Sequence, residues 1–136
     1  MKTLIVLCSL IITWVCHSQP AGVATAPPSD AKLTQAVAGT WTRGPLSYTA
    51  APLFSRTYSP DGSFTTSIGH SNALVTYQGT WLVKNQAIVM TVTNAQGTGN
   101  HAAGTPVGHV YRANILYLDE HQLIYATDGR TNTLTR

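Results

Sequence analysis

Cysteine is almost absent from this chain. Of its 136 residues only two are cysteines, Cys8 and Cys16, and both lie near the N-terminus. Beyond Cys16 the chain cannot form an internal disulfide, so its stability must come from packing. The apolar run from Leu4 to Val15 is too short to span a membrane, and no other stretch is as apolar. We therefore expect no transmembrane segment.

Charge is also scarce, since only 10% of the residues are Asp, Glu, Lys or Arg. From residue 19 onward seven basic residues stand against five acidic ones, and they are dispersed along the chain. This pattern excludes the dense basic patch that a nucleic-acid-binding protein needs. Ser, Thr, Gly and Ala are abundant while Glu is nearly absent, so the composition favours β-structure.

The few carboxylates all have a structural explanation. Each is at an expected helix start or in an expected turn, and they are Asp30, Asp61, Asp119, Glu120 and Asp128. None falls in a strand interior, where a catalytic pair or a Ser-His-Asp arrangement would need it. A nucleophile elbow, a phosphate-binding glycine loop and zinc-protease spacing are also missing. We therefore predict neither catalysis nor a cofactor.

The N-terminus has the pattern of a secretory leader. Lys2 precedes the apolar run from Leu4 to Val15, and small or polar residues follow it. We predict a signal peptide over residues 1–18 and a secreted or periplasmic protein, because cleavage after Ala26 would place a proline next. A lipoprotein anchored at Cys16 is the alternative, although Val15 is larger than the residue expected before a lipid-modified cysteine.

After the leader we expect a flexible tether over residues 19–28 and one domain over residues 29–136. A short helix opens the domain, with Ser29 or Asp30 as its N-cap and Gly39 just beyond its end. One apolar stripe runs along it, formed by Leu33, Ala36 and Val37.

Turn residues and apolar alternation predict eight strands, of which Tyr58–Val92 gives the clearest pair of hairpins. Their expected bounds are Thr40–Arg43, Leu53–Tyr58, Ser63–Ile68, Leu74–Val83, Ala87–Thr93, Gly108–Leu118, Gln122–Thr127 and Arg130–Thr135.

The connections alternate in length along the chain. The long ones are Gly44–Pro52, Gly69–Ala73 and Asn94–Val107, and the tight ones are Ser59–Gly62, Lys84–Asn85 and Asp119–Glu120; Asp128–Gly129 breaks the alternation. In an antiparallel meander every second connection lies at the same end, so the long loops gather at one open end. The helix precedes the first strand and should close the other end of an all-β, up-and-down antiparallel eight-stranded β-barrel.

Several motifs resemble the bacterial lipocalin-like domains, which are small calycin-type barrels. They are Gly39-Thr40-Trp41 after a short helix, the hairpin Tyr58-Ser59-Pro60-Asp61-Gly62-Ser63-Phe64, and Gly79-Thr80-Trp81. The resemblance covers Gly39 to Tyr125 and implies an exported barrel whose relatives bind small apolar molecules or are uncharacterised. It also implies an arginine packed on the first-strand tryptophan, without saying which arginine. Unlike longer lipocalins, the chain lacks disulfides and a C-terminal helix.

Alternation along the strands predicts which side chains face inward. On the strand Gly108–Leu118 we place His109, Tyr111, Ala113, Ile115 and Tyr117 inside. The inward residues nearest the open end are the predicted ligand site: Phe54, Arg56, Ile68, Tyr77, Val92, His109, Tyr111 and Tyr125.

An inward arginine must be paired, stacked on a ring or hydrated. Arg56 therefore has two interpretations, namely a partner for an acidic head group or a clamp stacked over Trp41 or Trp81, and we favour the clamp. The histidines near the open end, His70, His101 and His109, carry no metal-ligand spacing, so we expect solvated side chains and no metal site.

Two functional hypotheses follow. The first is a carrier that binds a small apolar molecule at the open end. The second is a filled structural barrel that contacts a protein partner through the loops Gly44–Pro52 and Asn94–Val107, since loops on a rigid scaffold often bind partners.

Overall fold

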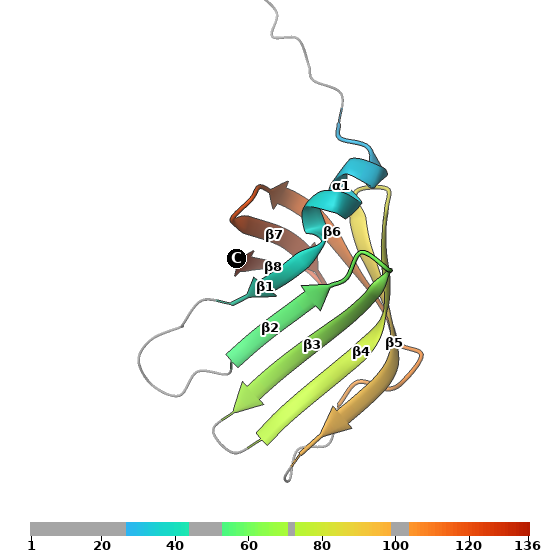
Figure 1. Cartoon of the computed structure of the whole chain (residues 1–136), viewed down its shortest axis with the longest axis vertical. Coiled ribbons are helices and arrows are strands. Elements are labelled where there is room, and N and C mark those ends of the chain that lie inside the picture. Colours follow the sequence, from blue (N-terminus) through green and yellow to red (C-terminus); the bar gives the residue numbers. More distant parts are fainter. Residues whose placement is uncertain (1–26, 44–52, 71–72, 99–103) are drawn as a thin grey trace, which may run out of the picture.

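Eight antiparallel strands form a closed barrel in which every strand pairs with its neighbours in sequence (Figure 1). The structure is a computed structural model and describes residues 27–43, 53–70, 73–98 and 104–136. The elements are α1 (Asp30–Val37), β1 (Gly39–Thr42), β2 (Leu53–Tyr58), β3 (Ser63–His70), β4 (Ala73–Lys84), β5 (Ala87–Gly97), β6 (Val110–Leu118), β7 (Gln122–Thr127) and β8 (Arg130–Thr135). The predicted fold class is thereby confirmed.

Helix α1 lies across one end of the barrel (Figure 1). Ser29 is its N-cap and accepts a hydrogen bond from the Lys32 amide at 3.4 Å. Asp30 reaches the β4–β5 turn instead, where its carboxylate accepts the amides of Asn85 at 2.8 Å and Gln86 at 3.1 Å. The helix therefore closes the end that carries this tight turn, as the order of elements predicted.

The side of α1 that faces the barrel is narrower than predicted. Leu33 and Val37 are buried, whereas Ala36 is exposed, so its place in the apolar stripe was wrong. Leu33 and Val37 are one helical turn apart and point the same way, which is enough for a helix of this length. α1, the helix in the described ranges, is too short to cross a membrane.

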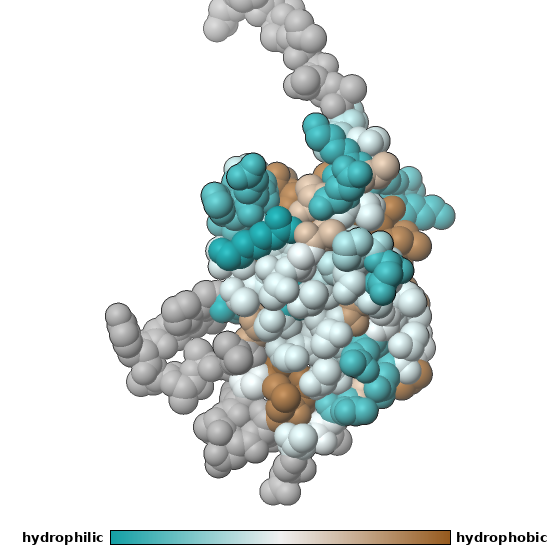
Figure 2. All heavy atoms as spheres, viewed as in Figure 1, coloured by the Kyte–Doolittle hydropathy of each residue, from teal (hydrophilic) through white to brown (hydrophobic). Residues whose placement is uncertain are grey.

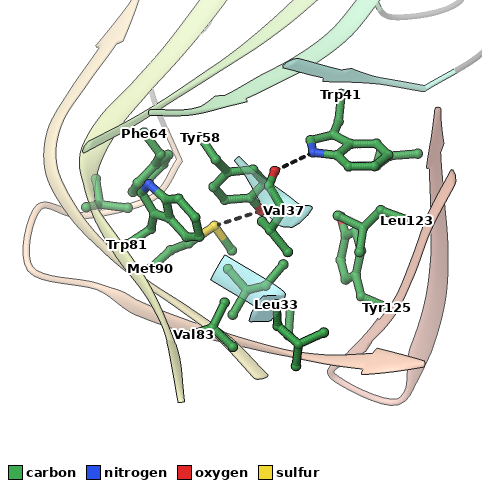
Figure 3. Close-up of a cluster of buried hydrophobic side chains, with 14 residues drawn as sticks. Leu33, Val37, Trp41, Tyr58, Phe64, Trp81, Val83, Met90, Leu123 and Tyr125 are labelled. Atoms are coloured by element: carbon green, nitrogen blue, oxygen red, sulfur yellow. Dashed lines mark hydrogen bonds between the residues drawn. The ribbon is translucent and has the colours of Figure 1, made fainter. Parts of the chain in front are cut away.

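The core lies mainly beneath α1, where aromatic side chains from several strands meet (Figure 3). The Trp41 indole donates to the Val37 carbonyl at 2.7 Å, and the Trp81 indole donates to the Ser59 carbonyl at 2.9 Å. The ring of Tyr58 lies 4.9 Å from that of Trp81, measured between centroids. Both tryptophans are thus structural, with every indole N–H satisfied.

Two connections at the open end differ from the predicted lengths. β3 and β4 continue to the pair His70 and Ala73, so Gly69, His70 and Ala73 of the expected long loop Gly69–Ala73 belong to the strands, and only residues 71–72 separate the two strands. β5 continues through Asn94 to Gly97 and pairs with β4, which shortens the expected loop Asn94–Val107. The extra pairing satisfies backbone groups that a loop would leave to water.

Outward-facing residues of β2, β3 and β4 are mostly serine and threonine, which explains the intermediate hydropathy of this face in Figure 2. Thr57, Thr65 and Gln78 lie side by side across the three strands. The hydroxyls of Thr40 and Thr57 are 2.9 Å apart and continue the row onto β1. Polar residues outside and aromatic residues inside give these strands the alternation from which they were predicted.

Several sequence predictions fall on residues outside the described ranges. They are the signal peptide over residues 1–18 with Cys16, all but the last two residues of the tether over residues 19–28, and the loop Gly44–Pro52.

Candidate functional site

A cavity of about 210 Å³ lies inside the barrel, toward the end opposite α1. One wall comes from β2 and β3, and another from β5 and β6, which are two to four strands away around the barrel. Thr105, Thr127 and Asp128 line it from the open end. The full lining is Arg56, Phe64, Thr66, Ile68, Tyr77, Met90, Val92, Thr105, Tyr111, Ala113, Tyr125, Thr127 and Asp128.

Most of the residues predicted for the ligand site meet in this cavity. Six of the eight line it, namely Arg56, Ile68, Tyr77, Val92, Tyr111 and Tyr125. His109 is exposed and lies edge-on to the Tyr111 ring, 4.4 Å between centroids. Phe54 is half-buried but not part of the lining, and its ring supports two guanidinium groups, those of Arg43 at 5.5 Å and Arg56 at 5.1 Å. Their binding role stays a prediction.

Arg56 occupies the most unusual position in the lining. Its Nε donates to the Thr66 hydroxyl at 2.7 Å, and its Nη1 donates to the Tyr58 hydroxyl at 3.4 Å. Tyr58 in turn donates to the Met90 sulfur at 3.5 Å, the contact drawn in Figure 3. These partners are neutral, so they orient the guanidinium without cancelling its charge.

The favoured clamp role for Arg56 was wrong. Arg56 stacks on Phe54 and not on Trp41 or Trp81, while Arg136 lies over Trp41 with its Cζ 4.1 Å from the ring centroid. Arg56 and Trp41 are partners on neighbouring strands, and both side chains point inward. The face of the indole is nevertheless occupied by Arg136, which follows β8. The arginine that stacks on Trp41 is therefore Arg136.

The tyrosines around Arg56 determine its electrostatics. Burial alone would lower the pKa of Arg56, but the hydroxyls of Tyr58 and Tyr125 outweigh that effect and raise the pKa above its ordinary value. Burial likewise raises the pKa of the Tyr58 phenol, although Arg56 opposes the change. At neutral pH the guanidinium is therefore charged and the Tyr58 phenol is neutral.

No carboxylate partner for Arg56 is found in the described part of the chain. Its contacts are hydroxyls and an aromatic ring, and the groups that shift its pKa are tyrosines. Asp128 lines the same cavity but is exposed at the rim, where its own hydrogen-bond partner is the Thr127 hydroxyl at 3.4 Å. Arg56 thus has no ion-pair partner among the described residues, and the carboxylate that shares the cavity with it, that of Asp128, lies at the rim.

Sequence reasoning missed several lining residues, for two different reasons. Phe64, Thr66 and Ile68 alternate on β3, so the alternation that located Ile68 could also have located Thr66. Thr105 precedes β6 and is brought to the cavity by the 2.7 Å contact of its hydroxyl with that of Tyr111. No periodic signal marks such a residue.

Two residues predicted to face inward on this strand are exposed, namely His109, which precedes β6, and Tyr117. Tyr117 is 49% exposed, because a register shift between Ile115 and Tyr117 inserts Leu116 as an extra residue. A β-bulge of this kind exchanges the two faces of the strand, so Leu118 packs on the core instead. Tyr111, Ala113 and Ile115 precede the bulge, and their inward placement was correct.

Among the described residues no group of three or more His, Cys, Asp and Glu side chains is arranged to hold a metal ion. His101 and the His70 side chain lie outside what the structure describes.

No protein-family model matches the chain, and a comparison with curated proteins finds no match either.

Proposed function

We propose that this protein is an exported carrier that binds a small, mostly apolar molecule in the barrel cavity, without a cofactor or covalent chemistry. The cavity itself is the observation that carries the proposal. Binding pockets are typically concave and mostly apolar, with a few polar groups that orient the ligand. Phe64, Met90 and Val92 supply apolar surface here, and Arg56, Thr66 and Tyr125 supply the polar groups.

The size of the cavity limits the ligand. A volume of about 210 Å³ exceeds the roughly 150 Å³ of an apolar cavity that admits benzene. It is smaller than the roughly 300–1,000 Å³ typical of sites for drug-sized ligands. The volume suits a molecule of about ten non-hydrogen atoms and not a long lipid chain.

Titration with small neutral probes tests this proposal. We expect 1-octanol or naphthalene to bind saturably, with shifts of amide resonances concentrated around the cavity. Ala113→Phe places a ring in the cavity and should weaken binding at least about tenfold. Asn114→Phe is the matched control, because Asn114 is the next residue on β6 and points outward.

A folded wild-type protein that binds none of these probes would contradict the carrier. That result would favour the filled structural barrel, which contacts a protein partner through its long loops. Thermal melting of both variants shows whether each has folded before its binding is compared.

Export is a separate part of the proposal and rests on the leader pattern of residues 1–18. Mass spectrometry of the protein purified from the expressing cell should find an N-terminus at Gln19. A lipid-modified N-terminal Cys16 would instead show the lipoprotein alternative.

A further inference from the structure

We propose that the ligand carries a carboxylate group bound by Arg56, so that the site selects a small monocarboxylic acid with an apolar body. This inference rests on the proposed carrier function and names the chemical class of its ligand.

The first argument is the unmatched charge of Arg56. Its side chain is half-buried in the cavity wall, and its neighbours in the described ranges are the hydroxyls of Thr66, Tyr58 and Tyr125 and the Phe54 ring. A buried cation is costly unless an anion or ample hydrogen bonding compensates it. A ligand anion would provide that compensation at the position where the protein does not.

The second argument is the set of donors that remains free. A guanidinium has five N–H donors, and two of the bonds from Arg56 are directed to Thr66 and Tyr58. The remaining donors form a planar fork, which matches the two oxygens of a carboxylate. The Tyr125 hydroxyl also lines the cavity and lies close enough to influence Arg56, so it could donate to the same anion.

The third argument is that Arg56 does not serve as the clamp on Trp41, because Arg136 occupies that position. Arg136 already stacks on Trp41 and donates to the carbonyl of Ala36 at 2.9 Å at the end of α1. Arg56 lies instead at the height of the cavity, where Thr66 is its register partner on β3 and Tyr77 is in turn the partner of Thr66 on β4. Its position is the one from which an interior cation can reach a ligand.

The apolar body of the acid fits the rest of the lining. Met90, Val92 and Ala113 on β5 and β6 carry no charged group, and Phe64 adds a ring beside them. Asp128 is exposed at the rim and would repel an anion there, which favours placing the carboxylate inside at Arg56. Octanoate, with about ten non-hydrogen atoms, has the size that the volume permits.

Isothermal titration calorimetry with octanoate, 1-octanol and octylamine, all near pH 7, tests the inference. These probes share one chain and differ in head-group charge. For the wild-type protein we expect octanoate to bind at least about tenfold more tightly than 1-octanol, and octylamine to bind most weakly. Equal affinity for octanoate and 1-octanol would overturn the carboxylate assignment.

Variants then connect the preference to Arg56. Arg56→Met keeps the length of the side chain and removes its charge, so octanoate should lose at least about tenfold in affinity while 1-octanol keeps its own. Arg112→Met is the matched control, because Arg112 is exposed on the outer face of β6 and should leave all three affinities unchanged. Retention of the octanoate preference by a folded Arg56→Met protein would overturn the proposal.

The two proposals fail in distinguishable ways. If 1-octanol binds and Ala113→Phe abolishes its binding, but octanoate binds no more tightly, the carrier function stands and the carboxylate assignment is rejected. No binding of any probe to the folded protein would reject both. Tighter binding of octyl sulfate than of octanoate would overturn the carboxylate as the anion that Arg56 selects.

Discussion

The guanidinium of Arg136 lies over the indole of Trp41, with its Cζ 4.1 Å from the ring centroid. The same group donates through Nη2 to the carbonyls of Ala36, at 2.9 Å, and Ala38. Trp41 meanwhile donates to the Val37 carbonyl at 2.7 Å. The last carbonyls of α1 have no partners within the helix, so these two side chains fix the helix end onto the barrel.

We expect Arg136→Ala to lower the free energy of unfolding by about 1–2 kcal/mol, since it removes a cation–π contact and the hydrogen bonds to the helix end. Urea denaturation measures the loss. The stability of Arg136→Lys should lie between those of the wild type and Arg136→Ala, because lysine keeps the charge but lacks the planar guanidinium. Arg130→Ala, at an exposed position at the start of β8, is the control and should change stability by less than about 0.5 kcal/mol. Equal losses at both positions would contradict the clamp.

The backbone at Gly79 leaves no room for a side chain. A Cβ at this position would lie 1.9 Å from the Thr91 carbonyl oxygen and 2.8 Å from the Phe64 ring. Neither group can withdraw easily, because one is backbone and the other is in the core. We expect Gly79→Ala to unfold the protein or lower its melting temperature sharply. Gly104→Ala should melt like the wild type, since nothing lies within 4 Å of its added Cβ. Circular dichroism during heating compares the two.

The strand order could be predicted from the sequence because tight turns and alternation are local signals. Ser59–Gly62 and Asp119–Glu120 mark hairpins through residues that favour turns, and neighbouring strands then pair in order. The six predicted residues that line the cavity follow from this alternation alone. Connection length was less reliable, as β3 and β4 continue past Gly69 because their backbone groups can still pair.

Features that depend on three-dimensional contacts could not be predicted. The bulge at Leu116 has no glycine to mark it, so Tyr117 was assigned to the wrong face. Either Arg56 or Arg136 could have stacked on Trp41 as judged from the sequence, and only the closure of β8 onto β1 decides between them. That closure is short, with Thr42 and Thr135 as its register pair within the described ranges.

The exposed aspartates should make the protein sensitive to acid. Hydrogen bonds from backbone amides and the Tyr117 hydroxyl lower the pKa of Asp119 from its ordinary value of 3.8, and amides of Gln86 and Asn85 do the same for Asp30. Because the pKa of each carboxylate is lower in the folded state, the unfolded state takes up protons at a higher pH than the folded state does. The stabilisation is therefore complete well above pH 3.8 and is lost as the pH falls through the lower folded-state pKa.

Urea denaturation at several pH values, with Asp119→Asn as the comparison, tests this dependence. Asparagine imitates the protonated aspartate, so the variant should be less stable than the wild type near neutral pH and approach it as the pH falls below 3.8. A stability difference that is the same at every pH would show that the carboxylate charge contributes nothing.

Thr66 and Arg56 should show strong energetic coupling. Thr66→Val alone removes the acceptor of the Arg56 Nε–H and leaves a buried donor unpaired, so we expect a loss of about 1–3 kcal/mol. The double variant Arg56→Met with Thr66→Val removes both partners and the uncompensated charge, so it should be at least as stable as the wild type. Thr65→Val, one residue away on the outer face, is the control and should change stability by less than about 0.5 kcal/mol. An additive double variant, measured by urea denaturation, would mean that the Thr66 hydroxyl and the Arg56 guanidinium do not interact energetically, which would contradict the expected coupling.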